Sequence, residues 1–335
     1  MHRPGFLPGI SIPHIPALHE ILEFPYNLYY LLCISVHGCI DALEEHPEHD
    51  ITRRCVMKPG IKKRHIAVFC LVLIICYLFW GPLFPWSPVT PGFIKTASEK
   101  AAVYIQKPAA HDSIALRIDC ILLQEEQFHG LTYTNKIKIL ILNRQSSMKR
   151  YLPWMRGSGY SVSLSLADLV YIGPNAQRSE QGIEPYLKHE LSHMLIGQNT
   201  TFKKAMKIHN QGWLAEGTAE YFSGHTFYTN EEFADLCAGS SIDFTSLQRR
   251  NPLKMPVRDL RLQYTFYRLF IEYLIDRYGL ETFQRFLKSY IQDPDAYEKL
   301  FAGIYGIDMH IMLEQCSKDI LKGTEPGSVP AGPVQ

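Results

Sequence analysis

The five residues H-E-L-S-H, from His189 to His193, constrain the fold of this chain more than any other feature. They lie inside a helix-compatible stretch, Ile183 to Ile196. Two histidines four positions apart lie on the same face of a helix, about one turn from each other. Both imidazoles can therefore reach a single Zn²⁺, with Glu190 directed toward a water beside the metal. The alternative is a surface helix with two histidines that bind no metal, because a five-residue match also arises by chance.

A second segment, W-L-A-E-G-T-A-E-Y from Trp213 to Tyr221, supplies carboxylates for the same site. A catalytic zinc needs three protein ligands and one open position, and two histidines leave one ligand missing. Glu216 can provide it from a second helix, and Glu220, one turn later, could accept the ring N–H of a ligand histidine. The alternative is that both glutamates lie on a solvated helix face. The small residues between them favour close helix packing instead.

Together, these two motifs resemble those of the gluzincin metallopeptidases, and most of all their compact peptidase MA-like members. The similarity covers the chain from about Ala101 to Gly279. The connection between the two motifs is longer than in the large aminopeptidases of this clan, and no G-x-M-E-N-type exopeptidase signature precedes it. The resemblance therefore implies a zinc peptidase without implying aminopeptidase specificity.

The resemblance also implies a role for each motif residue. His189, His193 and Glu216 would bind zinc, as the corresponding residues do in the family. Glu190 would act first as general base and then as general acid. Glu220 would orient a ligand histidine.

In gluzincins the strand before the motif helix is an edge strand that pairs with an extended peptide substrate. Leu169–Ile172 is the candidate here, which makes Tyr171 and Ile172 predicted substrate-binding residues. The alternative is that this segment forms an ordinary inner strand.

The resemblance further implies a tyrosine that stabilises the oxyanion opposite the metal. Tyr264 matches this pattern, since it precedes an apolar helix that ends in Tyr-Gly, and Tyr267 is an alternative. His209 and His225 flank the second motif and could also donate to the oxyanion. For each of these residues, a purely structural role is the alternative.

The order of predicted elements is strands first and helices later, which is typical of an α+β fold. The resemblance implies a small N-terminal sheet and a helical C-terminal half. Besides the two motif helices, strands are predicted at 101–106, 136–142, 160–166 and 169–172, and helices at 112–128, 145–152, 261–278, 280–290, 295–304 and 308–321.

Residues 66–86 form the strongest signal outside the two motifs. They are apolar, and no charge follows until Lys95, so they are predicted to form a transmembrane anchor. Lys58, Lys62, Lys63 and Arg64 come before this run. The positive-inside rule then places the amino end in the cytoplasm and the catalytic domain outside it. A cleaved signal peptide is the competing interpretation, but no A-x-A site follows the run.

The remaining parts of the chain fall around this anchor. Residues 1–65 are predicted to be a cytoplasmic segment. It is either disordered, or translation starts at Met57 and residues 1–56 are not part of the protein. Residues 87–322 are predicted to form the metallohydrolase domain, followed by a flexible tail at 323–335. Only three of the eight cysteines follow the anchor and no C-x-x-C pair occurs, so neither a cystine framework nor a thiolate zinc site is expected.

The sequence therefore predicts a membrane-anchored zinc hydrolase that acts on polypeptides. A net charge of +1 and the absence of a basic patch argue against nucleic acid as a partner. The oligomeric state has no signal in the sequence. Alternative functions are a zinc hydrolase for non-peptide amides, a zinc-binding interaction module that has lost catalysis, and a membrane-anchored assembly protein with a coincidental motif.

Overall fold

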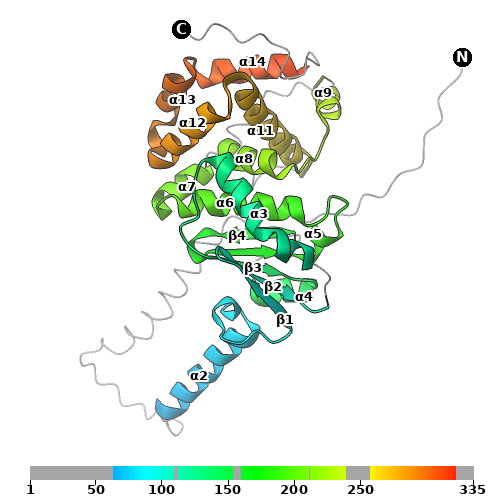
Figure 1. The fold of residues 1–335 in the computed structure, drawn as a ribbon, viewed down its shortest axis with the longest axis vertical. Helices are drawn as coiled ribbons and strands as arrows, with labels where there is room; N and C mark the ends of the chain where they lie inside the picture. Colours follow the sequence, from blue (N-terminus) through cyan, green and yellow to red (C-terminus); the bar gives the residue numbers. More distant parts are fainter. Residues whose placement is uncertain (1–62, 109–111, 154–159, 211, 239–256, 322–335) are drawn as a thin grey trace, which may run out of the picture.

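The computed structural model describes residues 63–108, 112–153, 160–210, 212–238 and 257–321. It has a mixed α+β fold, with a small sheet followed by a helical C-terminal half (Figure 1). This arrangement confirms the predicted α+β class, with a small sheet and a helical C-terminal half. The first 62 residues of the predicted N-terminal segment at 1–65 and the predicted tail at 323–335 lie outside the described residues.

The sheet has five strands in the order β1-β2-β3-β5-β4. Its central strands β2, β3 and β5 pair in parallel, and β1 and β4 pair antiparallel at the two edges. The strands are β1 (Phe93–Ala97), β2 (Ala101–Gln106), β3 (Ile137–Ile141), β4 (Ser161–Leu164) and β5 (Leu169–Ile172). All four predicted strands are present, and β1 is an additional strand that the sequence analysis missed.

The position of β5 contradicts the predicted edge strand. Leu169–Ile172 lies between β3 and β4, and its backbone is paired on both sides. The edge strand beside the motif helix is β4 instead. The order of strands in a sheet depends on contacts between distant parts of the chain, which a local hydrophobic pattern does not encode.

Each face of the sheet is covered by a different set of elements. On one face, α3 (Asp112–His129) and α6 (Glu184–Gln198) bury the side chains of Ile139, Val170 and Ile172. On the other face, Phe84, Met148 and Tyr151 pack against Tyr104 and Tyr171, from η2 (Phe84–Trp86) and α4 (Gln145–Tyr151). Two short elements, η3 (Ser165–Ala167) and α5 (Pro174–Arg178), flank β5.

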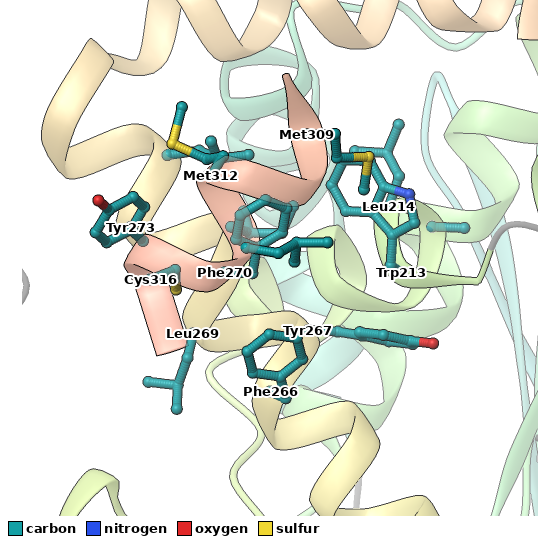
Figure 2. Close-up of a cluster of buried hydrophobic side chains, with 14 of the residues drawn as sticks. Trp213, Leu214, Phe266, Tyr267, Leu269, Phe270, Tyr273, Met309, Met312 and Cys316 are labelled. Atoms are coloured by element: carbon teal, nitrogen blue, oxygen red, sulfur yellow. The ribbon is translucent and has the colours of Figure 1, made fainter. Parts of the chain in front are cut away.

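The helical half begins after α6 and has its own hydrophobic core. Trp213 and Phe270 lie at the centre of this core, with ring centroids 5.3 Å apart, and Met312 packs in the same cluster (Figure 2). The helices are α7 (Phe202–Asn210), α8 (Trp213–Ser223), α9 (Asn230–Ala238), α11 (Val257–Tyr278), α12 (Leu280–Gln292), α13 (Tyr297–Tyr305) and α14 (Met309–Leu321), with η5 (Pro294–Ala296) before α13.

The apolar run at 66–86 does not form one continuous helix. Helix α2 (Lys63–Trp80) ends before Gly81, and Phe84–Trp86 form the separate element η2. Phe84 is fully buried against Phe93 and Tyr151, with ring centroids 4.6 and 5.1 Å away. The folded domain therefore includes η2, which the sequence analysis had assigned to the anchor. Within the described ranges, no helix combines the length and apolar character needed to cross a bilayer.

Candidate metal centre

The candidate site lies where α6 and α8 pack against each other. Helix α8 also packs closely on α11, because Gly217 has no side chain. A Cβ atom at Gly217 would lie 2.7 Å from the carbonyl oxygen of Tyr267, which is closer than such atoms can approach. The adjacent Glu216 is thereby held in a buried position facing α6.

Three of the predicted ligands converge on one point. Nε2 of His189 and Nε2 of His193 are 3.1 Å apart, and Oε2 of Glu216 lies 3.4 Å from each of them. Ligands at ordinary zinc distances in a tetrahedral site are separated by about 3.3 to 3.6 Å. The two nitrogens and one oxygen therefore fit three corners of a zinc tetrahedron.

The charges of this cluster also favour a cation. Burial opposes charge on His189, but hydrogen bonds to Glu216 and Glu220 raise its pKa well above 6.5. Burial would raise the pKa of Glu216, but the charge of His193 and hydrogen bonds with both histidines hold it well below 4.5. Both shifts show that positive charge among these side chains is stabilised, and Zn²⁺ would supply it.

Glu220 lies behind His189 and connects it to a third histidine. Nδ1 of His189 is 3.2 Å from Oε1 of Glu220, and Nδ1 of His225 donates to Oε2 at 2.9 Å. An imidazole that donates from Nδ1 presents the lone pair of Nε2 to a metal. The geometry thus matches the predicted orienting contact of Glu220. It places His225 against this carboxylate, with its ring centroid 5.0 Å from that of Tyr186 and 4.5 Å from that of Phe227.

Glu190 is buried beside the ligands and has a partner that the sequence analysis missed. Oγ of Ser161, in the edge strand β4, lies 2.8 Å from Oε1 of Glu190. The alternation of polar and apolar residues at 160–166 indicated a strand, but no local signal indicated that this strand faces α6.

The two tyrosine candidates lie on α11. Burial, and then the negative charges of Glu216 and Glu220, raise the pKa of Tyr264 well above 10, so its hydroxyl stays protonated. The hydroxyl of Tyr267 accepts a hydrogen bond from Nε2 of Gln263 at 2.6 Å. The other oxyanion candidate, His209, belongs to α7, and its side chain lies outside the described ones.

Tyr171 and Ile172 are not placed to bind a substrate, so their assignment as substrate-binding residues is wrong. Both are buried, with 1% and 0% exposure, and their backbone groups lie in an inner strand. The side chain of Tyr171 packs on the face of the sheet opposite α6. Ile172 belongs to the core between the sheet and α6.

No model of a protein family and no curated protein matches the chain. Similar solved structures include an M1 zinc metallopeptidase mutant from Deinococcus radiodurans bound to a Tyr-Ser-Ala substrate, with 18% identity and a TM-score of 0.38 over 71% of this chain and 51% of that chain. An M1 zinc metallopeptidase structure from the same organism has 16% identity and a TM-score of 0.38, over 72% of this chain and 53% of that one.

Yeast LTA4 hydrolase has 14% identity and a TM-score of 0.42, over 72% of this chain and 40% of that chain. The chain therefore spans about half the length of these proteins or less. Similarity at this level carries no argument about activity, and the case for the site rests on its own geometry.

Proposed function

We propose that this chain is a zinc metallohydrolase that cleaves peptide bonds. The observation that carries the proposal is the convergence of His189 Nε2, His193 Nε2 and Glu216 Oε2, at mutual distances of 3.1 to 3.4 Å. A bound Zn²⁺ would lower the pKa of a water toward ~7 and polarise a carbonyl. The same site contains Glu190, a buried carboxylate that is not one of the three ligands.

The chain's own residues would divide the work of hydrolysis. Glu190 takes the proton of the attacking water and returns it to the leaving amine. Tyr264, kept protonated by burial and nearby carboxylates, donates to the developing oxyanion. The outer edge of β4, which pairs with no second strand among the described residues, pairs with the backbone of an extended polypeptide, in place of the inner strand β5. A zinc-binding module without catalysis is the rival function, and the retained Glu190 favours hydrolysis.

The decisive comparison is between two variants of the full-length chain. Glu190→Gln should retain about one Zn²⁺ per chain, because Glu190 is not a ligand, but should hydrolyse a casein-type substrate ~10²-fold more slowly. His193→Ala should lose both zinc and activity. Metal analysis and proteolysis of the same preparations provide the readouts. Activity near wild type in Glu190→Gln would contradict the mechanism, and full zinc retention in His193→Ala would contradict the ligand assignment.

We also propose that the apolar segment containing α2 attaches the chain to a membrane, with the catalytic domain on the extracytoplasmic side, although α2 by itself lacks the length and apolar character of a spanning helix. Val68, Leu71 and Ile74 of this helix are 60%, 56% and 50% exposed, and lipid would remove this apolar surface from water. Four basic residues lie just before Ile66, while the first one after Trp86 is Lys95. This asymmetry favours an amino end in the cytoplasm.

A reporter fused after Gln335 tests this topology. Alkaline phosphatase should be active there, and a reporter that works only in the cytoplasm should be silent. The opposite pattern would place the catalytic domain inside the cell. A soluble product that lacks α2 would indicate cleavage of a signal peptide instead.

A further inference from the structure

The edge strand β4 and the adjoining η3 lie unusually close to α6. A Cβ atom at Gly197 of α6 would be only 2.4 Å from Cβ of Ser165. Oγ of Ser165 also lies 3.5 Å from the carbonyl oxygen of His193. Because this contact joins a glycine of α6 to a serine of η3, the two elements lie close together, and the adjoining strand β4 brings Ser161 within reach of Glu190.

We propose that Ser161 is a positioning residue that holds the carboxylate of Glu190 in its working orientation, an inference that rests on the proposed hydrolase function. The terminal torsion of a glutamate is broad and roughly two-fold, so its carboxylate is not fixed by its own rotamer. The hydroxyl of Ser161 donates to Oε1 at 2.8 Å. This hydrogen bond fixes the rotation of the carboxylate, and Oε2 is the oxygen that we assign to accept the proton of the attacking water.

This contact also connects the general base to the proposed substrate strand. Ser161 pairs with Ile172 of β5 on one side, and the other side of β4 is the edge of the sheet. A polypeptide added to that edge would bind β4, the strand that contains Ser161. Substrate position and base orientation are therefore set by the same four residues, Ser161–Leu164.

The test is the full-length variant Ser161→Ala. Losing a hydrogen bond to a charged group should lower kcat for a casein-derived peptide about ten- to a hundredfold. KM should change little, and zinc content should stay equal to wild type, because the ligands are untouched. Ser161→Thr keeps a hydroxyl in a strand position that suits β-branched residues, and it should recover most of kcat. Ser289→Ala, which removes a hydroxyl that bonds within α12, is the matched control and should match wild type.

A second readout is independent of activity. In metal-free protein, Ser161→Ala and Glu190→Gln should be non-additive in urea unfolding, with the double variant destabilised less than the sum of the singles. Wild-type kcat in Ser161→Ala, or strictly additive effects on unfolding, would overturn the positioning role alone. A parallel loss of zinc would show a merely structural role and would also overturn it. Absence of Glu190-dependent hydrolysis in the wild-type chain would overturn the proposed function, and this inference with it.

Discussion

Two clusters of histidine and glutamate lie against neighbouring faces of helix α6, and the pKa shifts of their side chains differ in direction. On one face, His189 and His193 meet the glutamates of α8. On the next, Ser192 meets His129 and Glu125 of α3, all three fully buried. The residue types are nearly the same in both clusters. Comparing them therefore shows which features of the surroundings make one cluster suited to a metal.

The surroundings of the α3 cluster favour the uncharged forms of its side chains. Nδ1 of His129 donates to the backbone carbonyl of Glu125 at 2.9 Å, so Nε2 accepts from the hydroxyl of Ser192 at 2.6 Å. Burial lowers the pKa of His129 to about 4. Burial likewise raises the pKa of Glu125 well above 4.5, more than Ser192 and the nearby charges lower it. Burial therefore shifts both side chains toward their uncharged forms.

The α8 cluster is less completely buried, with the side chains of His189 and Glu216 16% and 11% exposed, and it favours charge. The pKa of His189 is raised and that of Glu216 is lowered, in spite of burial. The two clusters also differ in the number of carboxylates around the histidine. His189 contacts two carboxylates, while His129 has one carboxyl oxygen at 3.6 Å. A histidine–glutamate pair in a core is thus neutral by default, and only several carboxylates that converge on the histidines turn it into a cation site.

Two substitutions, one in each cluster, test this comparison. Removing Glu220 from the α8 cluster is expected to have the larger effect, which is on zinc affinity. Glu220→Ala should weaken zinc binding by roughly 10- to 100-fold without abolishing it, because His189 loses the partner that orients its ring. Competition with a chelator measures this affinity. Glu231→Ala, at an exposed position in the first turn of α9, is the control and should bind zinc as the wild type does. An unchanged affinity in Glu220→Ala would mean that the contact with His189 is incidental.

The sequence predicted the metal cluster better than its surroundings, for a physical reason. Ligand spacing within one helix is local, so His189 and His193 could be placed on one face from sequence alone. Glu216 followed from the need for a third ligand. Ser161 and the inner position of β5 could not be predicted, because both depend on the order of strands in the sheet.

The α3 cluster was missed for a related reason. Glu125 and His129 lie one turn apart at the end of α3, a helix that the sequence predicted. Polar residues at the end of a helix are usually exposed, so nothing in the sequence indicated that these two are buried. Their burial depends on Ser192 and on the aromatic ring of Phe222, which contact them only in the folded chain. A histidine–glutamate pair in a sequence therefore does not reveal its own charge state.

Glu125→Gln should give the smaller effect, in stability rather than metal binding. Folding raises the pKa of Glu125 above its ordinary value of 4.5, so the protonated carboxyl group stabilises the folded chain. This stabilisation is fully present below about pH 4.5 and is lost as the pH rises through the folded pKa. The glutamine variant has no such loss, so it should become more stable relative to wild type by about 1.4 kcal/mol for each pH unit between that value and the folded pKa. Urea unfolding of metal-free protein at pH 5 and pH 6 measures the change, with the exposed Glu99→Gln as control. Zinc affinity should not change. A constant stability difference across these pH values would mean that Glu125 is charged in the folded chain, and the contrast between the two clusters would then fail.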